Sequence, residues 1–178
     1  VLYKDKEEYE DAIEMFTKAI SMRPDYVQAY YNLGVLYKDK EEYEDAIEMF
    51  TKAISMRPDY VQAYYNLGVL YKDKEEYEDA IEMFTKVKEL QPDHQNSYYN
   101  LALIKKEQGQ SEEAIELLLK VLDLNPQHSD AKAYAETLCN ELGMKLHKEG
   151  DNETALKYFK ILTLLRPKSA ACFYNTGN

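Results

Sequence analysis

The chain has 178 residues and a formal net charge of −11 at pH 7, with 22 Lys and Arg against 33 Asp and Glu. This charge disfavours nucleic acid and anionic membranes as partners, because both attract basic surfaces. Hydrophobic residues make up 45% of the chain, which is enough to build a core. No apolar run approaches the roughly 18 residues of a membrane span, and the first residues carry no signal-peptide pattern. Two cysteines cannot form a disulfide framework, so we expect a cytoplasmic (intracellular) location.

An internal repeat dominates the sequence. Four of the five prolines are evenly spaced, at Pro24, Pro58, Pro92 and Pro126, and the fifth, Pro167, follows after a longer interval. Residues 1–34 recur unchanged as residues 35–68, residues 69–86 repeat residues 1–18 once more, and drift begins at Val87. Packing does not require identity at solvated positions. The identical copies therefore reflect either a recent duplication or the deliberate multiplication of one natural repeat.

One period, residues 27–58, predicts two helices. The first has an apolar stripe at helical spacing, formed by Tyr30, Leu33, Gly34 and Tyr37. The second has another: Ala46, Ile47, Phe50, Ala53 and Ile54. A polar stretch at 39–42 separates the helices, and Pro58 ends the second. One such hairpin cannot bury both stripes alone, whereas stacked neighbours can, so the period predicts an all-α solenoid.

This period resembles the tetratricopeptide repeat (TPR). The signature positions that match are Tyr30, Leu33, Gly34, Tyr37, Ala46, Phe50, Ala53 and Pro58, and the pattern recurs along the chain. The resemblance implies a right-handed α-solenoid, a superhelix of antiparallel helix pairs. We expect a single domain, 1–178, divided into a partial repeat 1–26, repeats 27–60, 61–94 and 95–128, a long repeat 129–169 and the start of a further repeat, 170–178.

Two departures from the family pattern carry structural predictions. Gly109 and Gly150 stand at the turn between helices, whereas the identical copies have Glu7, Glu41 and Glu75 there. Those turns must be made without a left-handed residue, or at some strain. In the last full unit, seven additional residues lie around 129–135. They add about two helical turns, which predicts one long helix over residues 129–149 that projects beyond its neighbours.

The two ends of the sequence fall at the same place of the repeat. Val1 and Asn178 each correspond to a ninth place, inside a first helix. The pattern is typical of a piece of a longer solenoid with open ends. Residues 170–178 of one molecule could supply the front half-helix that another lacks, which predicts head-to-tail self-association. The alternative is that the flanking residues are merely missing from this sequence.

The sequence contains no catalytic constellation. It has no glycine-rich phosphate loop, and none of His94, His128 and His147 has a Cys or carboxylate partner at metal-ligand spacing. We interpret these residues as surface or turn histidines, and Cys139 as a core thiol. The prediction is a protein that is not an enzyme and needs no metal or cofactor.

Binding is the remaining class of function. In TPR superhelices the first helix of each unit lines the concave groove, and the resemblance implies twelve peptide-binding residues here: Gln28, Tyr31, Asn32, Val35, Gln62, Tyr65, Asn66, Val69, Asn96, Tyr99, Asn100 and Leu103. The Asn column can donate to and accept from a peptide backbone, and the Tyr column adds apolar area. The arrangement resembles the asparagine ladder of O-linked N-acetylglucosamine transferases. The alternative is that each Asn merely bonds to a neighbouring helix.

Three hypotheses follow for the function. The first is a non-catalytic interaction scaffold that binds an extended peptide or a partner helix of another protein in the concave groove. The second is the substrate-recognition arm of a larger enzyme, such as a glycosyltransferase. The third is an engineered or self-assembling repeat protein that stacks head-to-tail. We favour the first, because the repeat pattern implies binding and nothing in the sequence implies turnover.

Overall fold

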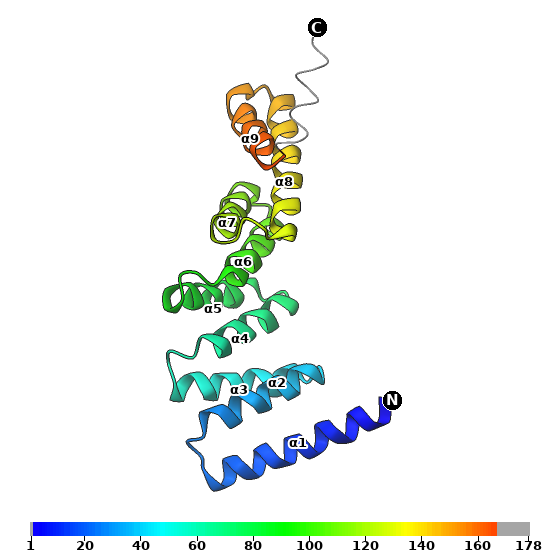
Figure 1. The fold of residues 1–178 in the computed structure, drawn as a ribbon, viewed down its shortest axis with the longest axis vertical. Coiled ribbons are helices and arrows are strands. Elements are labelled where there is room, and N and C mark those ends of the chain that lie inside the picture. The colour runs from blue at the N-terminus through cyan, green and yellow to red at the C-terminus, as the bar shows by residue number, and fades with distance from the viewer. Residues whose placement is uncertain (1, 167–178) are drawn as a thin grey trace. The chain divides into compact units, whose positions relative to one another are not determined.

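The computed structural model describes the backbone of residues 2–166 and the side chains of residues 9–166. Within this range the chain forms nine helices (Figure 1). They are α1 (Leu2–Met22), α2 (Val27–Asp39), α3 (Tyr43–Met56), α4 (Val61–Asp73), α5 (Tyr77–Leu90), α6 (Gln95–Glu107), α7 (Ser111–Leu124), α8 (Ser129–Glu149) and α9 (Asn152–Leu165). The predicted further repeat at 170–178 lies outside the described residues.

The helices belong to two compact units, residues 1–97 and 98–178, so the boundary falls inside α6. In the first unit α2 packs on α3 and α4 on α5, while α1 and α4 each pack against the neighbouring hairpin. In the second unit α8 packs on both α7 and α9. The predicted fold class, all-α with stacked antiparallel helix pairs, is confirmed within each unit.

The close approach of the two helices in a pair depends on a glycine facing an aromatic ring. A Cβ added at Gly34 would lie 2.8 Å from the Phe50 ring, and one at Gly68 would lie 2.9 Å from Phe84. Both rings are fully buried. Glycine is therefore required at this place of the first helix wherever phenylalanine stands at the facing place of the second.

The turn between paired helices has the same backbone in four repeats. In the α2–α3 turn, the amide of Glu41 donates to the Lys38 carbonyl (2.9 Å) and that of Glu42 to the Tyr37 carbonyl (2.9 Å), which closes the end of α2. The middle residue is left-handed: φ is 63° at Glu41, 62° at Glu75, 77° at Gly109 and 89° at Gly150. The two glutamates therefore adopt the left-handed conformation at some strain. Of the two alternatives that the sequence left open for these turns, strain is the correct one.

The third glutamate behaves differently, and the expectation of a turn there was wrong. Glu7 lies within α1, a continuous helix of 21 residues. Residues 1–22 have the same sequence as residues 35–56, which fold as the end of α2, a turn and α3. Among the described residues no helix precedes α1 to play the part that residues 27–34 play for α3. The same residues therefore adopt two backbone conformations within the described chain.

The long helix has the predicted bounds, since α8 spans Ser129–Glu149. Its additional turns do not stand free, however, which corrects the expectation that it projects beyond its neighbours. Ala131 and Ala135 are fully buried and share a core cluster with Leu118 and Val121 of α7. Small side chains at i and i+4 let the first turns of α8 pack closely on α7.

Candidate functional site

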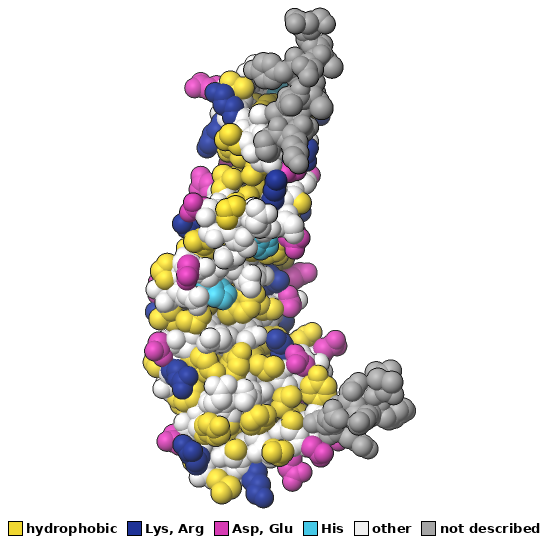
Figure 2. Space-filling view, viewed as in Figure 1, with side chains coloured by type: hydrophobic (Ala, Val, Ile, Leu, Met, Phe, Trp, Pro, Cys, Tyr) yellow, Lys and Arg dark blue, Asp and Glu magenta, His cyan; other side chains and the backbone are white. Residues whose placement is uncertain are grey.

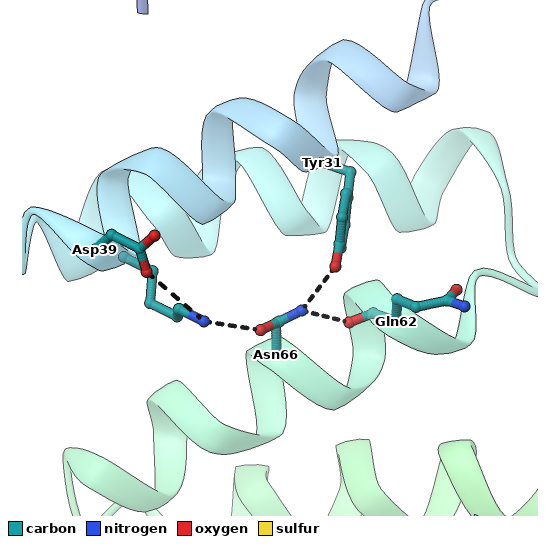
Figure 3. Close-up of polar contacts among 5 residues, drawn as sticks. Tyr31, Asp39, Gln62 and Asn66 are labelled. Carbon is teal, nitrogen blue, oxygen red and sulfur yellow. Dashed lines mark hydrogen bonds and ion pairs between the residues drawn. The ribbon is translucent and has the colours of Figure 1, made fainter. Parts of the chain in front are cut away.

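The column of asparagines begins on the first helices of unit 1, where Asn66 is part of a polar cluster (Figure 3). Lys38 Nζ donates to Asn66 Oδ1 (3.1 Å), and Asn66 Nδ2 donates to the Tyr31 hydroxyl (3.2 Å) and to the Gln62 carbonyl (2.9 Å). Asp39 lies 4.0 Å from Lys38 Nζ. The amide of Asn66 thus ties α4 to α2, and both its N–H groups are used within the protein.

Asn32, at the equivalent place of α2, is less committed. Its Oδ1 accepts a hydrogen bond from Gln28 Nε2 (2.9 Å), and Gln28 Oε1 accepts one from the Tyr60 hydroxyl (3.0 Å). Burial raises the pKa of Tyr60, so the phenol remains a donor at neutral pH. Among the described residues nothing accepts a hydrogen bond from Asn32 Nδ2.

The tyrosines of the predicted groove connect successive repeats by ring contacts. Each contacts the ring of the aromatic residue that precedes the first helix of the next repeat. Tyr31 lies 4.9 Å from Tyr60 and Tyr65 lies 5.0 Å from His94, measured between ring centroids. In unit 2, Tyr99 lies 5.3 Å from His128. These tyrosines are half-buried, so part of each remains exposed for a ligand.

Sequence reasoning missed the second aromatic residue in each of these ring contacts. Tyr60, His94 and His128 share one place of the repeat, and this spacing was the signal that could have identified them as a structural set. The interpretation of His94 and His128 as turn residues is correct for their position, because each stands just before a helix. Both also take part in packing. Nδ1 of His94 lies 2.9 Å from Ser97 Oγ, and Nδ1 of His128 accepts from the Ala131 amide (3.2 Å). Burial lowers the pKa of His94 and thus favours its neutral form.

The remaining predicted groove residues differ in exposure. In unit 1, Val35 and Val69 are half-buried, and Gln62 and Asn96 are exposed. In unit 2, Leu103 is half-buried, whereas Asn100 is only 8% exposed. Asn100 is therefore a poor candidate for direct contact with a peptide, although it occupies the same place as Asn32 and Asn66.

A shallow depression lies elsewhere on unit 1. It has a volume of about 480 Å³ and is lined by Tyr64, Glu82, Met83, Thr85, Lys86 and Glu89. None of the predicted groove residues contributes to it. The face drawn in Figure 2 carries acidic and basic side chains interspersed along its margins, with apolar and uncharged side chains between them.

The described residues offer little for catalytic chemistry. Cys139 is fully buried, and burial raises the pKa of its thiol to about 11, so it is protonated at neutral pH. Within the described part of the chain, no three or more His, Cys, Asp and Glu side chains are grouped so as to hold a metal ion. None of the described helices combines the length and apolar character that crossing a membrane requires.

Stacked antiparallel helix pairs with a regular period define a helical-repeat protein. Family models identify the repeat: tetratricopeptide-repeat models match residues 27–60 and 59–127, and a TPR-repeat model matches residues 2–40. The chain therefore belongs to the tetratricopeptide repeat family. A comparison with curated protein sequences gives no match.

Several solved structures are similar in fold. A crystal structure of MamA is 26% identical, with a TM-score of 0.71, and the match covers 94% of each chain. MamA 41-end from Desulfovibrio magneticus RS-1 is 23% identical with a TM-score of 0.65, and covers 89% of this chain and 86% of that one. YrrB, described as a TPR protein with an unusual peptide-binding site, is 22% identical with a TM-score of 0.68. That match covers 99% of this chain and 88% of YrrB.

Proposed function

We propose that the protein is an interaction scaffold, and that the first helices of unit 1 bind an extended peptide segment of a partner protein. The binding surface in this proposal is the asparagine face, defined as Gln28, Tyr31, Asn32, Val35, Gln62, Tyr65, Asn66 and Val69. The chain belongs to a repeat family, and the similar structure of YrrB is described as having a peptide-binding site. Both observations support a binding role. The likeness to asparagine ladders of glycosyltransferases remains a prediction.

The observation that carries the proposal is the hydrogen-bonded network across α2 and α4. Half-buried amides already held by protein contacts lose little conformational freedom when a ligand arrives. Asn32 Nδ2 can donate to a peptide carbonyl without breaking a contact among the described residues. Asn66 Oδ1 accepts from Lys38 and keeps a second lone pair for a peptide N–H. Two amides on successive repeats thus match the donor and acceptor alternation of an extended backbone.

The test begins with selection of peptides from a random phage-displayed library on the immobilised full chain. Affinity for a selected peptide is then measured by fluorescence anisotropy. Asn32→Ala and Asn66→Ala should each raise the Kd about fivefold to tenfold, since a net hydrogen bond contributes about 1 kcal/mol. Thr51→Ala is the control, because Thr51 is exposed on α3, a second helix outside the asparagine face.

Two results would refute the proposal. One is an unchanged Kd in the Asn32→Ala, Asn66→Ala double variant, with unaltered helix content by circular dichroism. The other is failure of the selection to yield any peptide above background. Equal weakening by Thr51→Ala would show that the effect does not come from the asparagine face.

A further inference from the structure

One stretch of sequence occurs with two backbone conformations in this protein. Residues 1–22 and 35–56 are identical, yet α1 is unbroken while the second copy bends at Glu41 between α2 and α3 (Figure 1). No local property of the sequence can separate the two cases. The straight helix is thus an accessible conformation of the residues around the turn.

Contacts with the front half of α2 hold the turn closed. The Phe50 ring lies against the backbone of Gly34, and Phe50, Ala46 and Ala53 are fully buried in the core of unit 1. A salt bridge between Lys40 and Glu42 (2.8 Å) spans the turn itself but is partly exposed to solvent. The bend therefore depends on packing between helices rather than on the turn residues.

The closed turn has a local cost that the drifted repeats avoid. Glu41 has φ 63°, a left-handed conformation that its Cβ disfavours, whereas Gly109 occupies the equivalent turn in α6–α7. The residues at 38–46 are Lys, Asp, Glu, Tyr and Ala, of which Lys, Glu and Ala are good helix formers. Opening the turn into a helix would relieve the strain, provided that the contacts of α2 with α3 are remade elsewhere.

A second copy of the chain can remake them. We propose that the α2–α3 hairpin is a hinge that opens at Glu41, so that residues 27–56 form one helix and two copies exchange α1 and α2. In this dimer the α2 of each copy packs on the α3 of the other, and every Gly34–Phe50 contact is re-formed between chains. Glu75 has a similar φ, 62°, but its surroundings match α1 only as far as residue 18, so Glu41 is the favoured hinge.

A pair of substitutions at one position tests the hinge. Glu41→Gly accepts the left-handed turn, whereas Glu41→Ala does not and favours helix. Both remove the same charge, so they are matched electrostatically. Sedimentation of the full chain from micromolar to millimolar concentration should reveal a wild-type dimer at twice the mass of one chain. Glu41→Gly should lower the dimer association constant roughly tenfold or more, because two hinges act in each dimer, and Glu41→Ala should leave it equal or higher.

The exchange of subunits provides a second measurement. Swapped chains separate only by unfolding locally, so unlabelled and ¹⁵N-labelled dimers mixed at neutral pH should form mixed dimers slowly, and rapidly in mild denaturant. Three results would overturn the proposal: the mass of a single chain at all concentrations, a mass that rises beyond the dimer, or equal dimerisation of the Gly and Ala variants. A mass rising without limit would instead indicate head-to-tail stacking.

Discussion

The glycine and the aromatic ring in each helix pair should be replaceable together but not singly. In the third full-length hairpin, α6–α7, Ala102 and Leu118 stand at the places of Gly34 and Phe50, and both are fully buried. The larger residue on one helix thus accompanies a smaller residue on the other. We predict that Gly34→Ala and Phe50→Leu each destabilise unit 1, and that the double variant recovers most of the loss.

The geometry sets the magnitudes. In Gly34→Ala, the new Cβ would lie 2.8 and 2.9 Å from two ring atoms of Phe50, well inside the roughly 3.5–4.0 Å of a normal carbon contact. Overpacking of this kind costs about 1–3 kcal/mol, and the better helix propensity of alanine offsets up to about 1 kcal/mol. Phe50→Leu removes ring volume from a fully buried site and should cost about 1–2 kcal/mol. In the double variant, the added methyl group of residue 34 fills space that the Phe50 ring leaves. Its unfolding free energy should therefore lie within about 1 kcal/mol of the wild-type value.

The assay is urea unfolding followed by circular dichroism, with the four proteins of a double-mutant cycle. The repeat supplies its own control. Gly34→Ala combined with Phe84→Leu makes the same two changes in residues whose contact partners are Phe50 and Gly68, so their effects should add. If the losses of unfolding free energy were also additive for Gly34→Ala and Phe50→Leu, the inference that the Phe50 ring limits the size of residue 34 would be refuted.

Two further predictions use pairs of equivalent residues. Burial lowers the pKa of His94 in the folded state below the unfolded value of about 6.5. The stability that depends on the neutral ring is therefore present above about pH 6.5 and is lost as pH falls through the folded pKa. His94→Tyr, which copies Tyr60, should make the unfolding free energy vary less with pH below about 6.5, and an unchanged slope would exclude His94 as the source of that variation. Phe50→Ala should cost about 3–5 kcal/mol because the ring is fully buried, whereas Phe16→Ala, in identical local sequence but half-buried, should cost about 1 kcal/mol in the same urea assay. Equal losses for the two would mean that their environments do not differ.

The helices were predictable because the period of the repeat and the period of the helix reinforce each other. Pro58 and the polar stretch at 39–42 mark the ends of α3 and α2 to within a few residues. The insertion of seven residues keeps the apolar stripe in phase, which is why the bounds of α8 could be predicted from spacing alone. Its packing could not, because nothing in the sequence of 129–135 says which neighbour Ala131 meets.

The candidate site was less predictable because it depends on contacts between repeats. The family resemblance placed Asn32, Asn66 and Asn100 at one functional position, but it could not say how each amide is used. Asn66 is engaged by Tyr31 and Lys38 of the preceding repeat, while Asn32 accepts a hydrogen bond from Gln28 of its own helix. Asn100 is buried. The local sequence is identical around Asn32 and Asn66, so only the surrounding packing distinguishes those two, whereas around Asn100 the sequence has drifted.

Identical residues fold differently in α1 and in α2–α3, so local sequence alone cannot predict the turn. A sequence-based rule that assigns the turn at Glu41 must also assign one at Glu7, since the surrounding residues are identical. The bend is selected by burial of Phe50 against Gly34, a contact worth several kcal/mol, which outweighs the cost of about 1–2 kcal/mol of a left-handed glutamate. Glycine at the turn, as at Gly109, removes the opposing cost and makes the bend less dependent on its neighbours.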